Sequence, residues 1–431
     1  MELEQSKLRV VVIGGSLGGL MCGLALKHSG HSVTVLEKEG DIRQSHQTGI
    51  TLGPDIREFL KRHDRHSEPF SIPSYVVQAL RADSEDTPRL LVKARRDSTS
   101  WDALYFRLRS CFDDYVSPHY PSPPPSCSTD GAATFLTHEE VVDLTQSGPD
   151  RLDLTVFNRD SREISHREFD LAIGADGPNS FVRTKYLPAI QPRYVGYVAW
   201  RVTIPEKHLS ASMRRTFANS LTICASHRQY CMIYVIPGRE GTLEPGERLL
   251  NFAWYTNESP QRLDEIMTDS IDGHRHATTV PAGHVRDDIW KAQVELGKKA
   301  RLPRACLEIL EKVQSPFVQA ITEFAAPTTM FEGGKVLLIG DAKCVFRPHL
   351  GAGASQAAFD ALRAEDFVGG RVTLQKWEQQ VLRYSRLQSS QAAWWGEWYL
   401  SDWITAAPYA LRYWFLCNIE MARSWLDNWR S

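Results

Sequence analysis

The chain has 431 residues, of which 42% are hydrophobic, so it is long enough to bury a large core and to form two or three domains. Its 50 basic and 52 acidic residues nearly cancel, and this balance favours neither a nucleic acid nor an anionic membrane as partner. We therefore expect a small-molecule partner, no nucleic acid and no membrane.

Residues 8–13 form a continuous apolar run, LRVVVI, which is typical of a parallel strand buried on both faces. Small and apolar residues at helical spacing follow at 20–27, and residues 32–36 predict a second strand. Together these segments predict a β–α–β unit of the usual length, which is the first half of a parallel sheet.

A glycine-rich turn joins this strand to this helix, with Gly14, Ser16 and Gly19 in the GxGxxG spacing. Gly14 permits a tight turn, Ser16 is small enough for a pyrophosphate to approach, and Gly19 lets the helix pack against the strand. Glu37 ends the second strand, where a carboxylate can bond ribose hydroxyls. The alternative is an ordinary strand-to-helix turn, but Glu37 favours a dinucleotide site.

The remaining chain alternates helical and strand patterns around one Pro- and Ser-rich surface loop at 117–130. Helices are predicted at 104–112, 138–144, 287–297 and 304–313. Strands are predicted at 151–157 and 167–173, in an antiparallel meander within 193–256, and at 335–339, where the first sheet is rejoined.

Eight cysteines are scattered along the chain without CxxC pairs or the Cys and His spacing of a zinc site. The pattern indicates reduced thiols of a cytoplasmic protein, and no secretory signal is evident before the first apolar run. We predict no metal site and a cytoplasmic location.

Two further glycine-rich segments carry a resemblance to a known family. One is GADGPNS at 174–180 with Arg183, and the other is GDA at 340–342 followed by RPHLGAG at 347–353. In this order, after the first turn, they resemble the flavoprotein aromatic hydroxylases, the single-component FAD monooxygenases. The resemblance spans most of residues 8–370 and leaves out the last 60 residues.

The resemblance narrows to one subgroup of that family. YVGYVAWR at 194–201, YVIPG at 234–238 and NFAWY at 251–255 are similar to the 2,6-dihydroxypyridine 3-hydroxylase and 6-hydroxynicotinate 3-monooxygenase subgroup. Trp101 and Cys344 depart from the wider family, in which many members have Arg and His there, and both fit the subgroup.

The resemblance implies FAD as bound cofactor, NADH or NADPH as co-substrate, and O2. The cofactor-binding residues predicted from the first turn and from the resemblance are Gly14, Ser16, Leu17, Gly19, Glu37, Lys38, Arg43, Arg107, Asp176, Gly177, Asp341, Pro348, Gly351, Ala352 and Gly353. Arg43, Arg107 and Arg109 are the candidates for the FAD contact that the missing Arg makes in the family.

The resemblance also implies the chemistry: reduced flavin and O2 form a C4a-hydroperoxide that attacks an electron-rich ring. A hydroxylated ring becomes richer when it loses its proton, so a base is expected, and histidine suits that role at neutral pH. The predicted catalytic residues are His46, His227, Tyr230, Cys231 and His349. The alternatives are a solvated polar loop residue at His46 and a backbone hydrogen bond in a tight loop at His349.

We therefore predict an α/β fold in which a Rossmann-type FAD-binding domain holds an inserted antiparallel β-sheet substrate domain, followed by a helical C-terminal segment. The FAD-binding domain is discontinuous and comprises 1–80, 101–185 and 326–375. The substrate domain comprises 81–100 and 186–325, and the C-terminal segment comprises 376–431.

The C-terminal segment is rich in tryptophan and is predicted to form two helices broken near Pro408. The tryptophans are Trp394, Trp395, Trp398, Trp403, Trp414, Trp425 and Trp429. Packing against the protein body or a homodimer partner is the first interpretation. A peripheral membrane helix is the rival, but the acidic residues of the segment argue against a basic polar face.

The predicted function is hydroxylation of a small electron-rich heteroaromatic ring such as a hydroxypyridine, with NAD(P)H and O2. One alternative is a tailoring monooxygenase acting on a larger indole or enol natural product. Others are a non-catalytic flavin-fold carrier and a dehydrogenase that holds NAD in the first turn.

Overall fold

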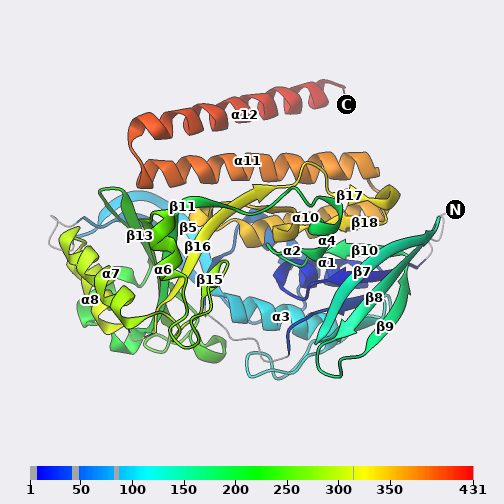
Figure 1. Ribbon diagram of the computed structural model, residues 1–431, viewed down its shortest axis with the longest axis horizontal. Helices are drawn as coiled ribbons and strands as arrows, with labels where there is room; N and C mark the ends of the chain where they lie inside the picture. The colour runs from blue at the N-terminus through cyan, green and yellow to red at the C-terminus, as the bar shows by residue number, and fades with distance from the viewer. Residues whose placement is uncertain (1–6, 41–47, 82–86, 314, 431) are drawn as a thin grey trace.

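The computed structural model describes residues 7–40, 48–81, 87–313 and 315–430 (Figure 1). Within these residues the strands form sheets of six, ten and three strands. The fold class is confirmed: a mixed α/β protein with a parallel sheet, a large mainly antiparallel sheet and a helical C-terminal segment.

The six-stranded sheet is parallel except at one edge. Its strands, in spatial order, are β17 (Met330–Phe331), β18 (Val336–Leu338), β10 (Leu171–Gly174), β1 (Arg9–Ile13), β2 (Ser32–Leu36) and β6 (Ala133–Leu136), with β17 antiparallel. Chain segments that are far apart in sequence therefore end at one sheet edge. Strands 8–13, 32–36 and 335–339 are confirmed to within a residue or two.

Strand β1 is buried on both faces, as its continuous apolar sequence predicts. Val10 and Val12 pack on a helical layer, whereas Val11 and Ile13 pack on the three-stranded sheet. The helical layer contains α1 (Leu17–His28), α2 (Pro54–His63), α3 (Trp101–Asp113) and α10 (Gly353–Val368). The three-stranded sheet contains β7 (Glu139–Gly148), β8 (Arg151–Asn158) and β9 (Ile164–Phe169).

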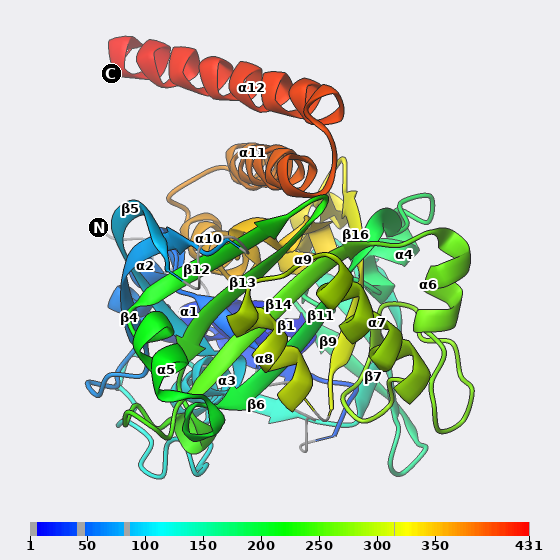
Figure 2. The same ribbon diagram turned by 90° about the vertical axis from the view of Figure 1, so that its left-hand side faces the viewer.

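The ten-stranded sheet lies beside the six-stranded one. Its strands, in spatial order, are β15 (Thr279–Val280), β16 (Phe317–Ala325), β11 (Arg193–Pro205), β14 (Leu249–Asn257), β13 (Gln229–Ile236), β12 (Ser220–Ser226), β4 (Ile72–Ala79), β5 (Arg89–Ser100) and β3 (Gly49–Thr51), with β19 (Cys344–Val345) paired to β16. The helices near its outer face are α5 (Ala211–Phe217), α6 (Pro260–Ile266), α7 (Asp287–Lys299) and α8 (Arg304–Lys312) (Figure 2).

One predicted element is wrong, and a second is divided in the structure. Residues 138–144 are not helical: His138 precedes strand β7 and residues 139–144 belong to it, with Val141 and Leu144 packed in the core against β8. Cross-strand pairing therefore overrides the local helical pattern. The strand predicted at 167–173 is divided at Asp170, because β9 pairs antiparallel with β8 whereas β10 joins β1 in the parallel sheet.

The C-terminal segment forms two long antiparallel helices, α11 (Leu374–Leu400) and α12 (Trp403–Arg430), stacked above the helical layer (Figures 1 and 2). The predicted break near Pro408 is wrong, because the chain turns at Ser401 and Asp402. Asp402 caps the new helix by accepting a hydrogen bond from the Thr405 amide at 3.0 Å, and Pro408 lies within α12. Neither these two helices nor any other described helix is long and apolar enough to cross a membrane.

The division into domains stays a proposal. Strands from segments 9–36, 133–136, 171–174 and 330–338 share the six-stranded sheet, as the proposal expects. Strands β3 and β4, however, belong to the ten-stranded sheet although the proposal places residues 1–80 in the FAD-binding domain.

Candidate active site

A cavity of about 1180 Å³ lies between the ends of the two large sheets. One end is lined by the turn after β1, and the other by aromatic side chains of the ten-stranded sheet. Most small-molecule sites occupy roughly 300–1,000 Å³, so this cavity has room for a large ligand and an additional guest.

The turn after β1 meets the loop after β10 at one end of this cavity. Gly14 has φ +104°, and a Cβ there would lie 2.5 Å from the carbonyl oxygen of Ala175. A Cβ at Gly19 would lie 1.9 Å from the Gly14 oxygen. Glu37 fixes the turn by accepting a hydrogen bond from the Gly15 amide at 2.8 Å. Only glycine permits these two close approaches.

The loop after β10 holds its shape through Asp176. One carboxylate oxygen accepts a hydrogen bond from the Ser180 hydroxyl at 2.5 Å, and the other accepts one from the Val182 amide at 3.2 Å. Burial raises the pKa of Asp176. Arg183 of α4 (Phe181–Tyr186) donates to the carbonyls of Pro178 and Ala342, and thereby joins this loop to the third glycine-rich segment.

The third segment begins at α9 (Gly340–Lys343), where a buried ion pair sets the backbone. Asp360 accepts hydrogen bonds from the Gly340 amide at 2.8 Å and from the Lys343 ammonium at 2.7 Å, and both charged side chains are fully buried. Asp341 lines the cavity. Its place deep in the protein and the charge of Asp360 raise the pKa of Asp341 to about 6, although its side chain is open to the cavity.

Two helix N-termini open onto this cavity, and both fit an anionic cofactor. Helix α1 begins after Ser16 and helix α10 after Ala352; neither has a side-chain cap or an acidic residue in its first turn. Their free amides and positive dipole ends suit a pyrophosphate or another electron-rich group. A Cβ at Gly177 or Gly353 would meet nothing within 4 Å, so these backbones leave open space for a ligand.

At the other end of the cavity, His349 lies between two tyrosines. Tyr197 Oη is 2.7 Å from His349 Nε2, and Tyr230 Oη contacts Nδ1. The ring of Tyr255 meets the imidazole edge to face, with centroids 5.0 Å apart. Burial and the charges of Arg347 and Arg201 lower the pKa of His349 to about 3. The imidazole is therefore neutral and fully engaged.

Arg201 and Asn251 add polar atoms to the same wall of the cavity. The Nε atom of Arg201 is buried and has no hydrogen-bond partner among the described residues. Asn251 accepts a hydrogen bond from the Gly49 amide at 3.0 Å, while its own Nδ2 lacks a partner in the same part of the chain. Buried polar atoms without partners are costly, so both residues are suited to bind a ligand.

Helix α11 closes this end of the cavity through Gln391, Trp395 and Tyr399. Tyr399 stacks on Tyr230 with centroids 4.5 Å apart. A Cβ at Gly396 would lie only 2.7 Å from Nε2 of His349, so this helix approaches the histidine as closely as a glycine allows. Sequence reasoning missed this contribution, because it treated the C-terminal helices as separate from the site.

The cavity brings together most of the predicted site residues. Those that line it are Gly14, Ser16, Leu17, Glu37, Lys38, Asp176, Gly177, Tyr230, Asp341, Pro348, His349, Gly351, Ala352 and Gly353. Gly19 lies just behind it in the first turn of α1. Arg43 and His46 lie outside the described residues. The individual roles of all these residues stay predictions.

Three predicted residues are not brought to the cavity. Strand residues alternate between the faces of a sheet, so Cys231 points away from Tyr230 and into the core. Burial raises the pKa of Cys231. His227 is exposed in the turn between β12 and β13. Arg107 is the third residue that does not line the cavity. The positions of Cys231, His227 and Arg107 therefore do not support the roles predicted for these residues.

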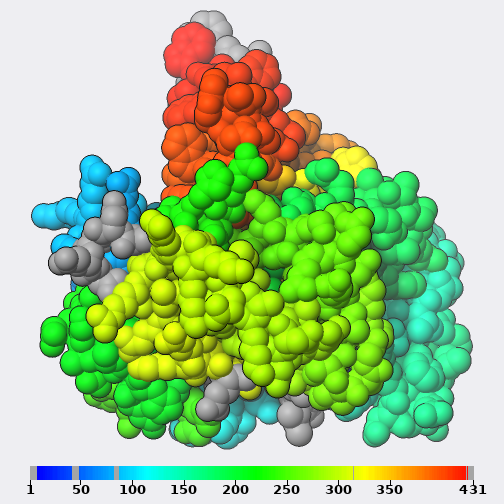
Figure 3. Space-filling view, turned by 60° about the vertical axis from the view of Figure 1, so that its left-hand side comes forward, coloured from blue at the N-terminus to red at the C-terminus, as the bar shows by residue number. Residues whose placement is uncertain are grey.

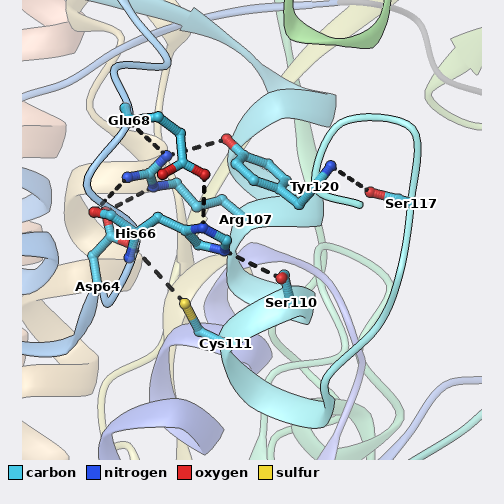
Figure 4. Close-up of polar contacts among 8 residues, drawn as sticks. All are labelled: Asp64, His66, Glu68, Arg107, Ser110, Cys111, Ser117 and Tyr120. Atoms are coloured by element: carbon cyan, nitrogen blue, oxygen red, sulfur yellow. Dashed lines mark hydrogen bonds and ion pairs between the residues drawn. The ribbon is translucent and has the colours of Figure 1, made fainter. Parts of the chain in front are cut away.

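Arg107 holds the loop after α2 (Figure 4). Its guanidinium donates to Asp64 at 2.7 Å and to the backbone carbonyls of His66 and Glu68. Every one of these partners belongs to the protein, and the side chain is only 3% exposed. Tyr120 lies against the same guanidinium. In this structure Arg107 thus links residues 64–68 to α3.

Comparison with known proteins places this geometry in a family. Residues 9–50 match the FAD binding domain model, and residues 194–323 match an FAD binding domain-like model. The chain is 30% identical over 381 residues to 2,6-dihydroxypyridine 3-monooxygenase of Paenarthrobacter nicotinovorans, which covers 87% of each chain. The chain belongs to the FAD-binding monooxygenase family. It is therefore an FAD-dependent enzyme, and the predicted resemblance is confirmed.

Comparison with other proteins supports the same family. This chain is 24% identical to 6-hydroxynicotinate 3-monooxygenase of Bordetella bronchiseptica, over 83% of this chain and 82% of that one. The solved structure of 2,6-dihydroxypyridine-3-hydroxylase from Arthrobacter nicotinovorans is 27% identical and superposes with a TM-score of 0.73, over 92% and 91% of the two chains. Klebsiella pneumoniae HpxO, solved with FAD and uric acid, shares the fold at 17% identity, with a TM-score of 0.67 and coverage of 95% and 93%.

The described residues contain no group of three or more His, Cys, Asp or Glu side chains that could hold a metal ion. The cofactor of this monooxygenase is FAD. The first turn, the loop after β10 and the segment 340–353 are the parts of the cavity that fit it.

Proposed function

We propose that this monooxygenase hydroxylates a small, electron-rich heteroaromatic ring of the hydroxypyridine type, with NADH or NADPH and O2 as co-substrates. Two relatives named above act on a hydroxypyridine or a hydroxynicotinate by their names. The observation that carries the proposal is the continuous cavity, which runs from the nucleotide-type turn to a wall of tyrosines and to Arg201, whose buried Nε has no hydrogen-bond partner among the described residues.

Arg201 supports an anionic form of the ring. A hydroxylated heteroaromatic ring that has lost its proton carries negative charge and is more reactive toward an electrophilic oxygen. The guanidinium of Arg201 lines the cavity, and charge-assisted hydrogen bonds to such an anion are stronger than neutral ones. Flat aromatic walls provided by Tyr230 and Tyr255, which stack with centroids 4.8 Å apart, suit a flat guest.

Bound FAD, once reduced by the nicotinamide nucleotide, supplies the oxygen chemistry. The protein positions the cofactor and the substrate ring relative to each other. Gly14, Asp176, Asp341 and Gly353 are proposed to hold the cofactor at the end of the cavity where the two helices begin. The aromatic side chains of the opposite wall exclude water from the ring.

His349 is proposed to orient Tyr230 rather than to act as the base. A neutral imidazole has one donor and one acceptor nitrogen. Because both nitrogens face tyrosine hydroxyls, the tautomer fixes whether Tyr230 donates to His349 or accepts from it. Only a Tyr230 hydroxyl that accepts from His349 keeps its own proton free to donate to the ring. A pKa near 3 makes His349 a poor proton acceptor at neutral pH. His46, outside the described residues, stays the predicted base.

The test is substrate-dependent oxidation of NADH and NADPH by the FAD-loaded enzyme across hydroxypyridines, hydroxynicotinates and indoles. Turnover under labelled O2 should add one labelled oxygen atom to a hydroxypyridine product, measured by mass spectrometry. Nucleotide oxidation that gives no oxygenated ring with any hydroxypyridine or hydroxynicotinate would reject the proposed substrate class. Oxygenation of the indoles alone would favour the larger natural-product substrate instead.

A further inference from the structure

Helix α12 contacts the rest of the protein through one side. Tyr413 stacks on Trp394 of α11 with ring centroids 5.5 Å apart, and Glu420 pairs with Arg383 of the same helix. Asp402 is engaged as the cap of α12 and contacts Arg228 at 3.3 Å. Glu420 and Asp402 thus pair with arginines of the same chain and do not lie on the outer side of α12.

The outer side of α12 is apolar along most of its length. We call it the α12 ridge, and its members are Trp403, Ile404, Leu411, Trp414, Phe415, Met421 and Trp425. Every one of them is more than half exposed. At about 100° per residue, they fall within an arc of roughly 120° on the helix surface. Figure 3 shows α12 rising as a ridge above the body of the molecule.

A soluble surface rarely carries a continuous apolar stripe of this kind unless something covers it. Tryptophan, phenylalanine and methionine are the residue types that protein interfaces prefer, and acidic residues are those that they avoid. The composition of the ridge therefore indicates an interface rather than an ordinary solvated face.

We propose that the α12 ridge is the contact surface for a second copy of this chain, related by a twofold axis. An aromatic side chain buries roughly 150–250 Å², so the four aromatic members, each more than half exposed, provide on the order of 400–650 Å². The three aliphatic members bring this close to the roughly 800 Å² per partner of a standard stable interface. A self-complementary patch of this size closes as a dimer.

The packing of α12 favours a second copy over a lipid surface. A helix that lies in a membrane surface must offer its polar side to the lipid headgroups. In this structure the side of α12 opposite the ridge is packed on α11, where Tyr413 and Glu420 make their contacts. The inference rests on the geometry of α12 alone and does not depend on which ring the enzyme hydroxylates.

The test compares three forms of the full-length FAD-loaded enzyme by sedimentation velocity over a range of concentrations. One is the wild type, the second carries Leu411→Glu with Phe415→Glu, and the control carries Ile164→Glu with Ile271→Glu at two other exposed apolar positions. We expect wild type and control to be dimers. The dimer dissociation constant of the ridge variant should rise by at least about 100-fold, because two charges would enter an apolar interface.

Retention of the flavin spectrum and of the unfolding temperature shows that the ridge variant is folded. Should the glutamates prevent folding, Leu411→Ala with Phe415→Ala removes the same contacts without adding charge and should still weaken the dimer. A monomeric wild type, or a ridge variant that dimerises as tightly as the control, would overturn the proposal. A monomeric wild type that sediments with phosphatidylglycerol vesicles would point to a lipid surface instead.

Discussion

Gly396→Ala is expected to destabilise the protein, although alanine normally stabilises the middle of a helix by about 0.5–1 kcal/mol over glycine. The new Cβ would lie 2.7 Å from His349 Nε2 and 3.2 Å from Tyr197 Oη, so the histidine has to move. Overpacking costs about 1–3 kcal/mol, and the weakened Tyr197–His349 hydrogen bond adds about 1 kcal/mol. We expect a net loss of about 1–3 kcal/mol in the free energy of unfolding.

A double-mutant cycle in urea isolates the cause. In a His349→Ala background the imidazole is gone, so Gly396→Ala should recover the ordinary helical gain or be neutral. The coupling free energy between the two positions should then be at least about 1 kcal/mol. An equal cost of Gly396→Ala in both backgrounds would refute the reasoning, because the helix and not the histidine would then be responsible.

Arg201→Gln should raise KM for an anionic ring by roughly 10- to 100-fold, since a hydrogen bond to a charged group contributes about 1.5–3 kcal/mol. Steady-state kinetics would show this increase, and an unchanged unfolding temperature would show that the variant is folded. An unchanged KM would mean that Arg201 does not bind the ring. Gly19→Ala should give a protein that fails to retain FAD, because the new Cβ would lie 1.9 Å from the backbone oxygen of Gly14 in the turn after β1. A variant that purifies with bound FAD would contradict this prediction. The pKa of His349, about 3 in the folded protein, lies below its value of about 6.5 in the unfolded chain. As the pH falls below 6.5 the unfolded chain binds a proton that the folded protein does not, so His349 should lower the free energy of unfolding by up to about 1.4 kcal/mol per pH unit. A His349→Gln variant should lose that part of the pH dependence, and identical pH profiles for the two proteins would count against it.

The cofactor end of the site could be predicted because its signals are local. A glycine turn between a buried strand and a helix requires the same close approaches wherever it occurs, and Gly14 and Gly19 make them here. The carboxyl ends of β1, β10 and β18 meet at one sheet edge, so the three glycine-rich segments converge without further information.

The ring end could not be predicted in the same way, because it depends on contacts between distant segments. Gly396 follows no motif, and its importance appears only once α11 lies against His349. Arg107 was a reasonable cofactor ligand by sequence, but its guanidinium is taken by Asp64 and by the loop after α2. The helical pattern at 138–144 likewise yields to pairing with β8.

The place of α11 connects the C-terminal helices to both ends of the cavity. Gln391, Trp395 and Tyr399 of α11 line the cavity at every fourth position, while Trp394 stacks on Tyr413 of α12. Ala392 of the same helix packs against Phe346, Leu350 and Ala352 of the segment that fits FAD, so a shift of α11 would change the space for the guest and the cofactor segment together. A substitution in the C-terminal helices is therefore expected to alter ring binding and FAD retention at the same time.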